Sequence, residues 1–176
     1  MNTSLLARVY GTLTTAGIRS ALIGAGALAV HGVSRSTFDR DLLVVDKRAL
    51  ERQTWATLPE TVSIDIRRGD AEDPLEGVIR LSSGAERVVD VIVGRHRWQF
   101  RLLEEASAVE TPDATLSVVS APGLVLLKLY AGGPQDLWDI EQLRSVHGKE
   151  LDAAVDAGIH ALPADARETW RRVRGA

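Results

Sequence analysis

The sequence contains no cysteine, which excludes disulfides, thiolate catalysis and cysteine-based zinc sites. It has no apolar run that reaches the roughly 18 residues of a membrane span, and no basic segment followed by a long apolar run at its start. Its formal net charge is −3, so no global basic field indicates binding to nucleic acid. Together these absences predict a soluble cytoplasmic protein that has no membrane partner.

The chain has 176 residues, of which 45% are hydrophobic. This is enough for one compact core and short for two large domains. We therefore expect a single domain over residues 1–176, with a core at about residues 18–100 and a helical part at about residues 101–176. The chain shows no internal repeat and no low-complexity segment.

Apolar periodicity and the positions of glycine and proline predict mixed helices and strands. Helices are expected over residues 4–16, 27–31, 47–57, 102–106, 122–130 and 136–146. Strands are expected over residues 20–23, 38–45, 61–67, 77–83, 86–94 and 115–120. Turns are expected at residues 24–26 and, as a hairpin, at residues 82–86. This mixture predicts an α/β or α+β fold, a mixed β-sheet flanked by helices.

Two aspartates, Asp39 and Asp41, lie within the apolar strand "FDRDLLVV". Alternate residues of a strand point to the same face, so their Cβ atoms lie roughly 6–7 Å apart. Like charges at this separation oppose each other's ionisation unless a cation lies between them. The alternative is that both lie at the exposed start of an edge strand, where charge discourages aggregation.

A third aspartate, Asp90, favours the functional interpretation. In "VVDVIV" it shares one face with Val88 and Ile92, while valines occupy the other face. A buried unpaired carboxylate would cost several kcal/mol or become neutral, so we expect a polar or cationic group beside it. Asp65, which lies in "VSIDIR", is expected to be an ordinary solvated strand residue.

Three carboxylates on neighbouring strands make a site of hard oxygen ligands. Mg²⁺ suits such a site, because it keeps several waters and binds through a few carboxylates together with the phosphates of a nucleotide. Two such ions can activate an attacking oxygen and stabilise a leaving pyrophosphate. The three aspartates therefore suit a site for Mg²⁺ and a nucleotide.

The motifs occur in a defined order. Gly24-Ala25 is followed, after thirteen residues, by Asp39-Arg40-Asp41, and then by "VVDVIV" and "LVLLKLYAGGPQDLWDIEQL". Over about residues 20–145 this series resembles the DNA polymerase beta-like nucleotidyltransferase superfamily. The stretch "GAGALAVHGVSRSTFDRD" resembles, within that superfamily, the AbiEii/MenT-like group of bacterial nucleotidyltransferases, many of which are toxin components. The family turn usually has Gly or Ser where this chain has Ala25, and an apolar residue where it has Arg40.

The resemblance implies a nucleotidyltransferase fold with a C-terminal helical extension. It also implies Mg²⁺-dependent transfer of a nucleoside monophosphate from an NTP to a hydroxyl or phosphate acceptor. The acceptor can be a small molecule, a protein side chain or an RNA 3′ end such as that of tRNA. A toxin of this group would further imply an antitoxin partner.

The resemblance assigns roles to individual residues. Asp39 and Asp41 would bind Mg²⁺, and Asp90 would be the third acidic residue and the base toward the acceptor hydroxyl. Gly24, with Ala25 beside it, would let the backbone approach the phosphates closely. Lys128 matches the lysine that contacts the triphosphate.

Further residues of the nucleotide site are expected on the loop before the carboxylates and near the C-terminal helices. Arg35 and Thr37 flank the loop, where a guanidinium could hold a phosphate or pair with Asp39 or Asp41. The resemblance matches Asp136 to the acidic residue that follows the lysine.

Each of these residues also has a structural interpretation. Lys128 can extend from an apolar helix to water, and Asp136 suits the start of a helix by capping. His31 fits a packed or capping residue better than a base. The polar face of the last predicted helix would hold Asp139, Glu141 and Gln142.

The basic C-terminal segment "ARETWRRVRGA" has two interpretations. Arginines beside Trp170 could grip a phosphate backbone, but such a segment is more often the end of a solvated amphipathic helix. The arginines are Arg167, Arg171, Arg172 and Arg174.

Two other functions remain open for the same motifs. The first is a noncatalytic nucleotide- or partner-binding protein that keeps the nucleotidyltransferase fold. The second is a phosphohydrolase that uses the same acidic cluster and releases inorganic phosphate, although the spacing of turn and carboxylates favours transfer.

Overall fold

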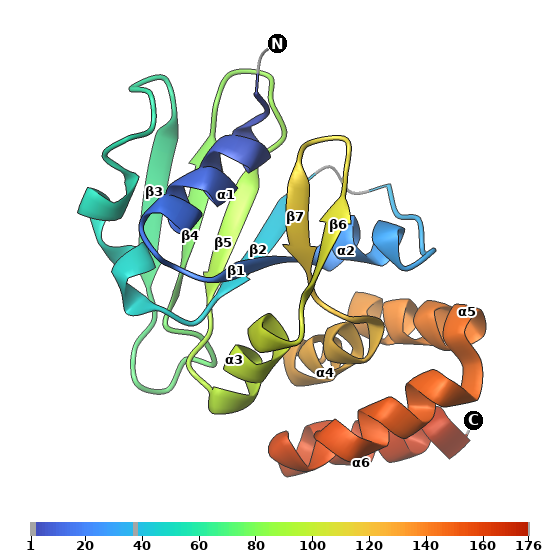
Figure 1. The fold of residues 1–176 in the computed structure, drawn as a ribbon. Helices are drawn as coiled ribbons and strands as arrows, with labels where there is room; N and C mark the ends of the chain where they lie inside the picture. The colour runs from blue at the N-terminus through green and yellow to red at the C-terminus, as the bar shows by residue number, and fades with distance from the viewer. Residues whose placement is uncertain (1–2, 37–38, 176) are drawn as a thin grey trace. The chain divides into compact units, whose positions relative to one another are not determined.

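The computed structural model describes residues 3–36 and 39–175 (Figure 1). Its contacts divide the chain into two compact units. The first, which we call the sheet unit, consists of Met1–Gly26 and Ser36–Val119. The second, the helical unit, consists of Ala27–Arg35 and Ser120–Ala176.

The sheet unit contains seven strands and two helices, together with two 3₁₀ turns. The strands are β1 Ser20–Ile23, β2 Arg40–Val44, β3 Ser63–Arg68, β4 Gly77–Ser82, β5 Val89–Val93, β6 Ser107–Glu110 and β7 Thr115–Val118. The helices are α1 Leu5–Thr15 and α3 Arg97–Glu104, and the 3₁₀ turns are η1 Lys47–Leu50 and η2 Arg52–Trp55. A further helix, α2 Gly24–Val30, begins in this unit and ends in the helical unit.

The strands form one mixed sheet in the order β3-β4-β5-β2-β1-β7-β6. β2 and β5 pair in parallel, as do β1 and β7, and the other neighbours are antiparallel. Helix α1 packs against β1 and β5 (Figure 1). On β5, Val89, Val91 and Val93 are fully buried, whereas Asp90 and Ile92 on the other face are partly exposed. The expected alternation of this strand is therefore present, and it fixes which face carries the carboxylate.

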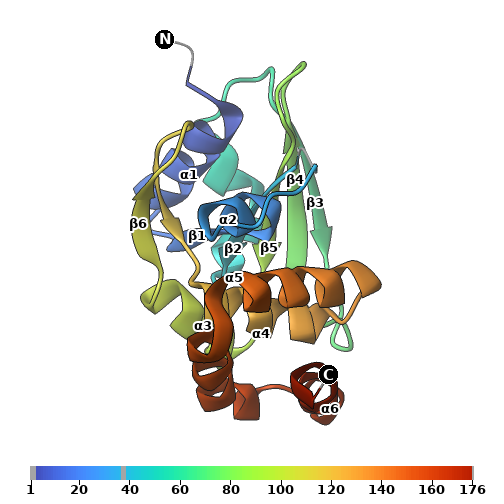
Figure 2. The same cartoon turned by 90° about the vertical axis from the view of Figure 1, so that its right-hand side faces the viewer.

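The helical unit contains three further elements of α-helix. These are α4 Ala121–Ala131, α5 Pro134–Gly158 and α6 Ala164–Gly175, with a 3₁₀ turn, η3 Ile159–Ala161, between the last two. Ser120 caps α4 by accepting a hydrogen bond from the backbone N–H of Gly123. Figure 2 shows that α5 bends. The bend lies at Gly148, whose φ of 65° and ψ of −149° are not helical.

The predicted fold class is confirmed, since the sheet is mixed and accompanied by helices. Each of the six predicted strands is present, and its ends lie within three residues of the predicted ends. Phe38, the first residue of one predicted strand, lies outside the described residues. The predicted helix at residues 47–57 is wrong, because Glu51 is extended and separates two 3₁₀ turns. The predicted turn at residues 24–26 is also wrong, since α2 already begins at Gly24.

None of the helices described in residues 3–36 and 39–175 has the length and apolar character needed to cross a membrane.

Candidate functional site

Four charged side chains form a row across one face of the sheet. In the strand register, Asp41 of β2 lies opposite Asp90 of β5, Asp90 lies opposite Arg80 of β4, and Arg80 lies opposite Asp65 of β3. Residues that are register partners on adjacent strands share a face. Asp39 lies two residues before Asp41 and directly before β2 begins. We call Asp39, Asp41 and Asp90 the carboxylate cluster.

Asp90 lies in a mostly desolvated setting. Its side chain is 16% exposed, and its Oδ1 atom is buried without a hydrogen-bond partner. Burial raises the pKa of Asp90 above its usual value, the positive charge of Arg80 lowers it, and the negative charge of Asp39 raises it further. The cation that we expected beside Asp90 is Arg80, whose Nε lies 3.8 Å from Oδ1.

Arg80 also contacts Asp39, so one guanidinium forms ion pairs with two carboxylates. Its NH2 group donates a hydrogen bond to Asp39 Oδ2 at 3.1 Å. Both side chains are about half exposed, so solvent weakens this ion pair. Arg80 therefore balances charge in the cluster through a contact that a metal ion or a nucleotide can displace.

Gly24 makes room for Asp41. Its φ is +60°, a left-handed conformation that glycine adopts at little cost. A Cβ atom at this position would lie 2.0 Å from Asp41 Oδ2 and 2.9 Å from its Cγ. Glycine at position 24 is predicted to let phosphate approach the backbone. It is also needed because the Asp41 carboxylate occupies the space where a side chain would lie. Ala25, the next residue, lies half-buried in the first turn of α2.

The chemistry of the cluster fits Mg²⁺, although its present arrangement is not that of a closed metal site. Within the described part of the chain, no three His, Cys, Asp or Glu side chains are grouped so that they could hold a metal ion. Asp39 instead contacts Arg80. The donors are nevertheless hard carboxylate oxygens, and the unpartnered Oδ1 of Asp90 lacks the hydrogen bond that a buried oxygen normally has.

A second charged cluster, which we call the lysine cluster, lies in the helical unit. Lys128 of α4 is only 8% exposed, and its Nζ lies 3.1 Å from Asp136 Oδ1 and 2.5 Å from Asp139 Oδ2. Arg35 donates a hydrogen bond to Asp139 Oδ2 at 3.1 Å. Lys128 thus does not extend freely to water, and two carboxylates of α5 hold its ammonium group.

Asp139 is a residue that the sequence interpretation missed. It was expected on the polar face of its helix, which is wrong, since it is fully buried and pairs with two cations. Its neighbours along the helix, Ile140 and Leu143, are also fully buried. The spacing of Asp139 and Leu143, four residues apart, was the available signal that Asp139 lies on the buried face.

Other predicted residues have simpler settings. Asp136 accepts a hydrogen bond from the backbone N–H of Gly133 and so also caps α5. His31 packs edge-on against His147, with ring centroids 5.9 Å apart, in agreement with a packed residue. Asp65 is about half exposed and pairs with Arg67, as expected for a solvated residue. Thr37 lies outside the described residues.

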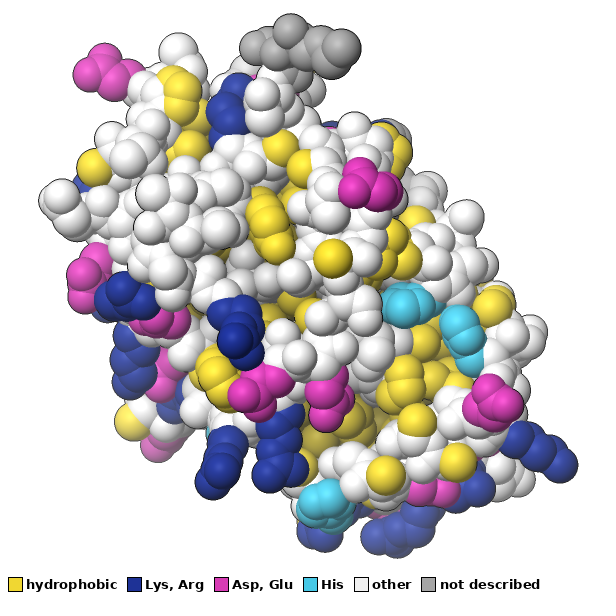
Figure 3. Space-filling view, in the orientation of Figure 1, with side chains coloured by type: hydrophobic (Ala, Val, Ile, Leu, Met, Phe, Trp, Pro, Cys, Tyr) yellow, Lys and Arg dark blue, Asp and Glu magenta, His cyan; other side chains and the backbone are white. Residues whose placement is uncertain are grey.

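The C-terminal segment does not offer an aromatic surface for bases. Trp170 is 2% exposed, and its indole N–H donates to Asp156 Oδ1 at 2.8 Å. Two of the nearby arginines pair with acids, Arg171 with Glu168 and Arg174 with Asp156. On the face shown in Figure 3, basic and acidic side chains are interspersed. These contacts support the amphipathic-helix interpretation over a phosphate-gripping tail.

No model of a protein family matches the chain, and no curated protein matches it in sequence. Solved structures do match it in fold. An antigenic nucleotidyltransferase-like protein from Paracoccidioides brasiliensis is 16% identical, with a TM-score of 0.52 over 93% of this chain and 89% of that one. A putative nucleotidyltransferase from Thermotoga maritima is 18% identical, with a TM-score of 0.53 over 80% and 89%.

An antibiotic-resistance factor gives a similar result. ANT(2″)-Ia, solved in complex with adenylyl-2″-tobramycin, is 12% identical, with a TM-score of 0.54 over 89% of this chain and 95% of that one. At these identities the likeness concerns the fold. The chain therefore has the fold of nucleotidyltransferase-like proteins, as its motif order implied.

Proposed function

We propose that the protein is a nucleotidyltransferase that transfers a nucleoside monophosphate from an NTP to a hydroxyl or phosphate acceptor. The observation that carries this proposal is the register of Asp41 opposite Asp90 on adjacent parallel strands, with Gly24 leaving room for Asp41. The fold shared with nucleotidyltransferase-like proteins supports it.

In this reaction an acceptor oxygen forms a bond to the α-phosphorus of the NTP. The bond between that phosphorus and the bridging oxygen to the β-phosphate breaks, and pyrophosphate leaves. Asp39, Asp41 and Asp90 would hold Mg²⁺, which neutralises phosphate charge when bound. Asp90 borders the acceptor and takes the proton of its hydroxyl. The protein otherwise contributes position and electrostatics, which this chemistry chiefly requires.

The motif order assigns several residues to the nucleotide. In the sheet unit, Gly24 and Ala25 would let the backbone approach the phosphates. Lys128 would contact the triphosphate, with Asp136 as the acidic residue that follows it, and Arg35 and Thr37 are the candidates from the loop before the carboxylates. The contacts of Lys128 with Asp136 and Asp139 support this role, because they hold its ammonium group in one place.

Finer assignments follow from the motif order. We place the protein in the AbiEii/MenT-like group, with transfer to a small molecule, a protein or an RNA 3′ end, and with an antitoxin as partner. The test is a labelled NTP incubated with the protein and a cell lysate or total RNA. Label in one class of molecule identifies the acceptor, and co-purification of a second protein identifies the partner.

The proposal predicts nucleotide binding that depends on Mg²⁺ and on the carboxylate cluster. In a thermal-shift assay, each NTP should raise the Tm of the protein only when Mg²⁺ is present. The protein should also release pyrophosphate from the NTP. Asp41→Asn should abolish the shift and lower the release rate at least about a hundredfold, since it removes charge at the reacting phosphate. Asp65→Asn is the matched control, because Asp65 lies in the same row and is solvated.

Two results would contradict this prediction. One is the absence of any nucleotide-dependent shift in the wild-type protein with Mg²⁺. The other is an unchanged shift in Asp41→Asn.

A noncatalytic nucleotide-binding protein is the second candidate, and one observation favours it. Arg80 already bridges Asp39 and Asp90, so part of the negative charge of the cluster is balanced without a metal. This candidate gives nucleotide-dependent stabilisation without pyrophosphate release. Release of inorganic phosphate instead of pyrophosphate would indicate a phosphohydrolase.

A further inference from the structure

A cavity of about 330 Å³ lies beside the carboxylate cluster, within the sheet unit. It is lined by the paired ends of β3 and β4, by the loop at residues 69–76 that joins these strands, and by Asp90 of β5. Its volume lies at the lower end of the range for small-molecule sites, roughly 300–1,000 Å³. A ligand in it would be compact and would contact Asp90, a residue of the proposed catalytic site.

Three arginines (Arg67, Arg68 and Arg80) and two aspartates (Asp73 and Asp90) line the cavity, so arginines exceed acids by one. Arg67 of β3 lies opposite Val78 of β4, and Arg80 follows two residues after Val78, so the three side chains share one face. Arg67 donates through Nε to Asp65, and Arg80 donates through NH2 to Asp39. A guanidinium carries five N–H donors, so both keep donors for a ligand. Their side chains are 77% and 49% exposed.

Part of the remaining wall is apolar, and the loop that carries it is held in place. Val78, Pro74 and Leu75 contribute apolar surface to the cavity. Arg95 fixes the loop that carries Pro74 and Leu75, because its guanidinium donates to the backbone carbonyls of Asp70, Ala71 and Leu75 at 2.8–3.1 Å.

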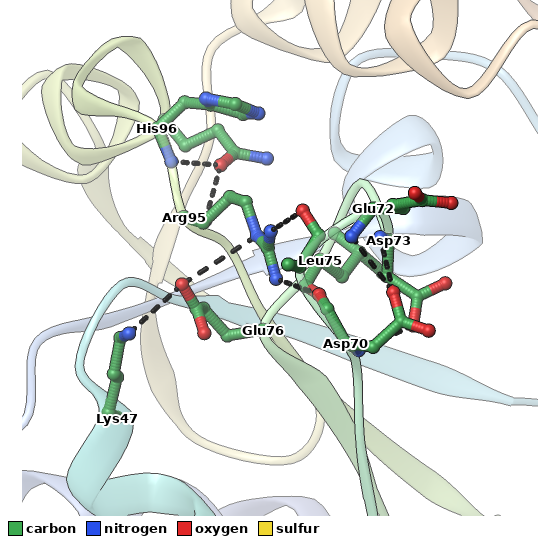
Figure 4. A network of polar contacts seen from close by, with 10 residues as sticks. Lys47, Asp70, Glu72, Asp73, Leu75, Glu76, Arg95 and His96 are labelled. Atoms are coloured by element: carbon green, nitrogen blue, oxygen red, sulfur yellow. Dashed lines mark hydrogen bonds and ion pairs between the residues drawn. The ribbon is translucent and has the colours of Figure 1, made fainter.

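Figure 4 shows this network, in which Asp70 and Asp73 also accept hydrogen bonds from backbone N–H groups of the loop. The loop therefore forms a wall before any ligand binds. Such pre-organisation reduces the entropy cost of binding.

We propose that this cavity binds the acceptor of the transfer reaction, and that the acceptor is a small hydroxyl compound bearing a phosphate or carboxylate group. This rests on the proposed function. The anionic group pairs with Arg67 and Arg80, the carbon skeleton packs on Val78 and Leu75, and a hydroxyl faces Asp90. That hydroxyl oxygen forms the new bond to the α-phosphorus, its proton passes to Asp90, and pyrophosphate leaves. A polycationic acceptor is excluded by the two guanidiniums.

The test measures binding without NTP or Mg²⁺, so that it does not depend on catalysis. Ribose 5-phosphate is the probe, with ribose, inorganic phosphate and tobramycin, a polycation, as comparisons in calorimetry. Ribose 5-phosphate should bind saturably and at least about tenfold more tightly than any of the three. Arg67→Gln should weaken it about tenfold, since a charge-assisted hydrogen bond is lost. Arg101→Gln, an exposed arginine of α3, is the control and should change nothing.

Three results overturn the proposal: no saturable binding of ribose 5-phosphate, equal binding of inorganic phosphate, or equal binding to Arg67→Gln. None of them affects the thermal shift with NTP, so the proposed transferase function would stand. Conversely, if ribose 5-phosphate binds through Arg67 but no NTP stabilises the protein with Mg²⁺, the transferase function fails and the anion site remains. With both intact, ribose 5-phosphate should raise pyrophosphate release in wild type more than in Arg67→Gln.

Discussion

At the scale of single residues, the carboxylate cluster depends on one glycine. Gly24 combines a positive φ with a side-chain position that the Asp41 carboxylate already fills. A non-glycine residue in the left-handed region costs roughly 1–2 kcal/mol. The overlap with the Asp41 carboxylate adds to that cost, because this side chain must move away to admit a Cβ atom.

Gly24→Ala should therefore harm stability and function together. We expect it to lower the free energy of unfolding by about 2 kcal/mol or more and to remove the Mg²⁺-dependent nucleotide shift, since Asp41 must move. Urea unfolding and the thermal shift measure the two effects. Gly11→Ala is the control, because a Cβ there meets no atom within 4 Å and alanine favours the helix by about 0.5–1 kcal/mol. A Gly24→Ala protein of wild-type stability and nucleotide response would refute this reading of Gly24.

Residue-level prediction from the sequence was uneven for a physical reason. Asp39, Asp41 and Asp90 stand out because charge interrupts apolar strands. Arg67 lies in β3 and Arg80 in β4, and only the pairing of β4 with β5 brings Arg80 to Asp90. Contacts between residues far apart in the sequence cannot be predicted from the local pattern of apolar and polar residues.

At the scale of elements, alternation and capping were the reliable signals. Strands with one buried face were predicted, whereas β6 was missed because it is a four-residue edge strand with mostly exposed side chains. The helix expected at residues 47–57 failed for another reason. Asp46 accepts a hydrogen bond from the Arg48 backbone N–H, and Trp55 donates to the Ala49 carbonyl. These tertiary and local bonds favour two 3₁₀ turns over one helix.

The lysine cluster joins helices α4 and α5, and Asp139 is its fully buried carboxylate. Asp139→Asn should lower the free energy of unfolding by about 3 kcal/mol, because it removes the negative charge that the buried Lys128 and the partly buried Arg35 share. Denaturant unfolding measures this loss. Glu150→Gln, an exposed substitution on the same helix, should stay within about 0.5 kcal/mol of wild type. Equal stabilities of the Asp139 and Glu150 variants would show that the cluster contributes nothing to the α4–α5 pairing.

At the scale of the whole molecule, topology brings distant motifs together. Asp41 and Asp90 meet because β2 and β5 are parallel neighbours, and the β3–β4 hairpin between them in sequence extends the sheet on the outer side of β5. That hairpin supplies the arginines and the loop of the cavity. The motif order identified the carboxylates, but the cavity follows from strand order, which the sequence pattern leaves open.

The charge pairs of the molecule also set how its stability depends on pH. Arginine partners lower the pKa of Asp46, Glu86 and Asp152 through side-chain hydrogen bonds. A carboxyl group whose pKa is lower in the folded state stabilises the fold above its unfolded pKa, near 4. That stabilisation disappears as pH falls through the folded pKa. Asp90 has the opposite effect on stability, because burial raises its pKa and its ionised form therefore destabilises the fold.

The contribution of these three groups to the free energy of unfolding should be lost as pH falls below about 4, whereas the contribution of Asp90 should change in the opposite sense above pH 4. Asp152→Asn isolates one contribution, because Arg144 donates to both oxygens of Asp152 at 2.9 and 3.0 Å. Its difference from wild type should be largest near pH 6 and should shrink as Asp152 protonates in the native protein. Urea unfolding at a series of pH values measures this difference, with Glu150→Gln as the control. A difference that stays constant down to pH 2 would mean that the pKa of Asp152 is the same in the folded and unfolded states.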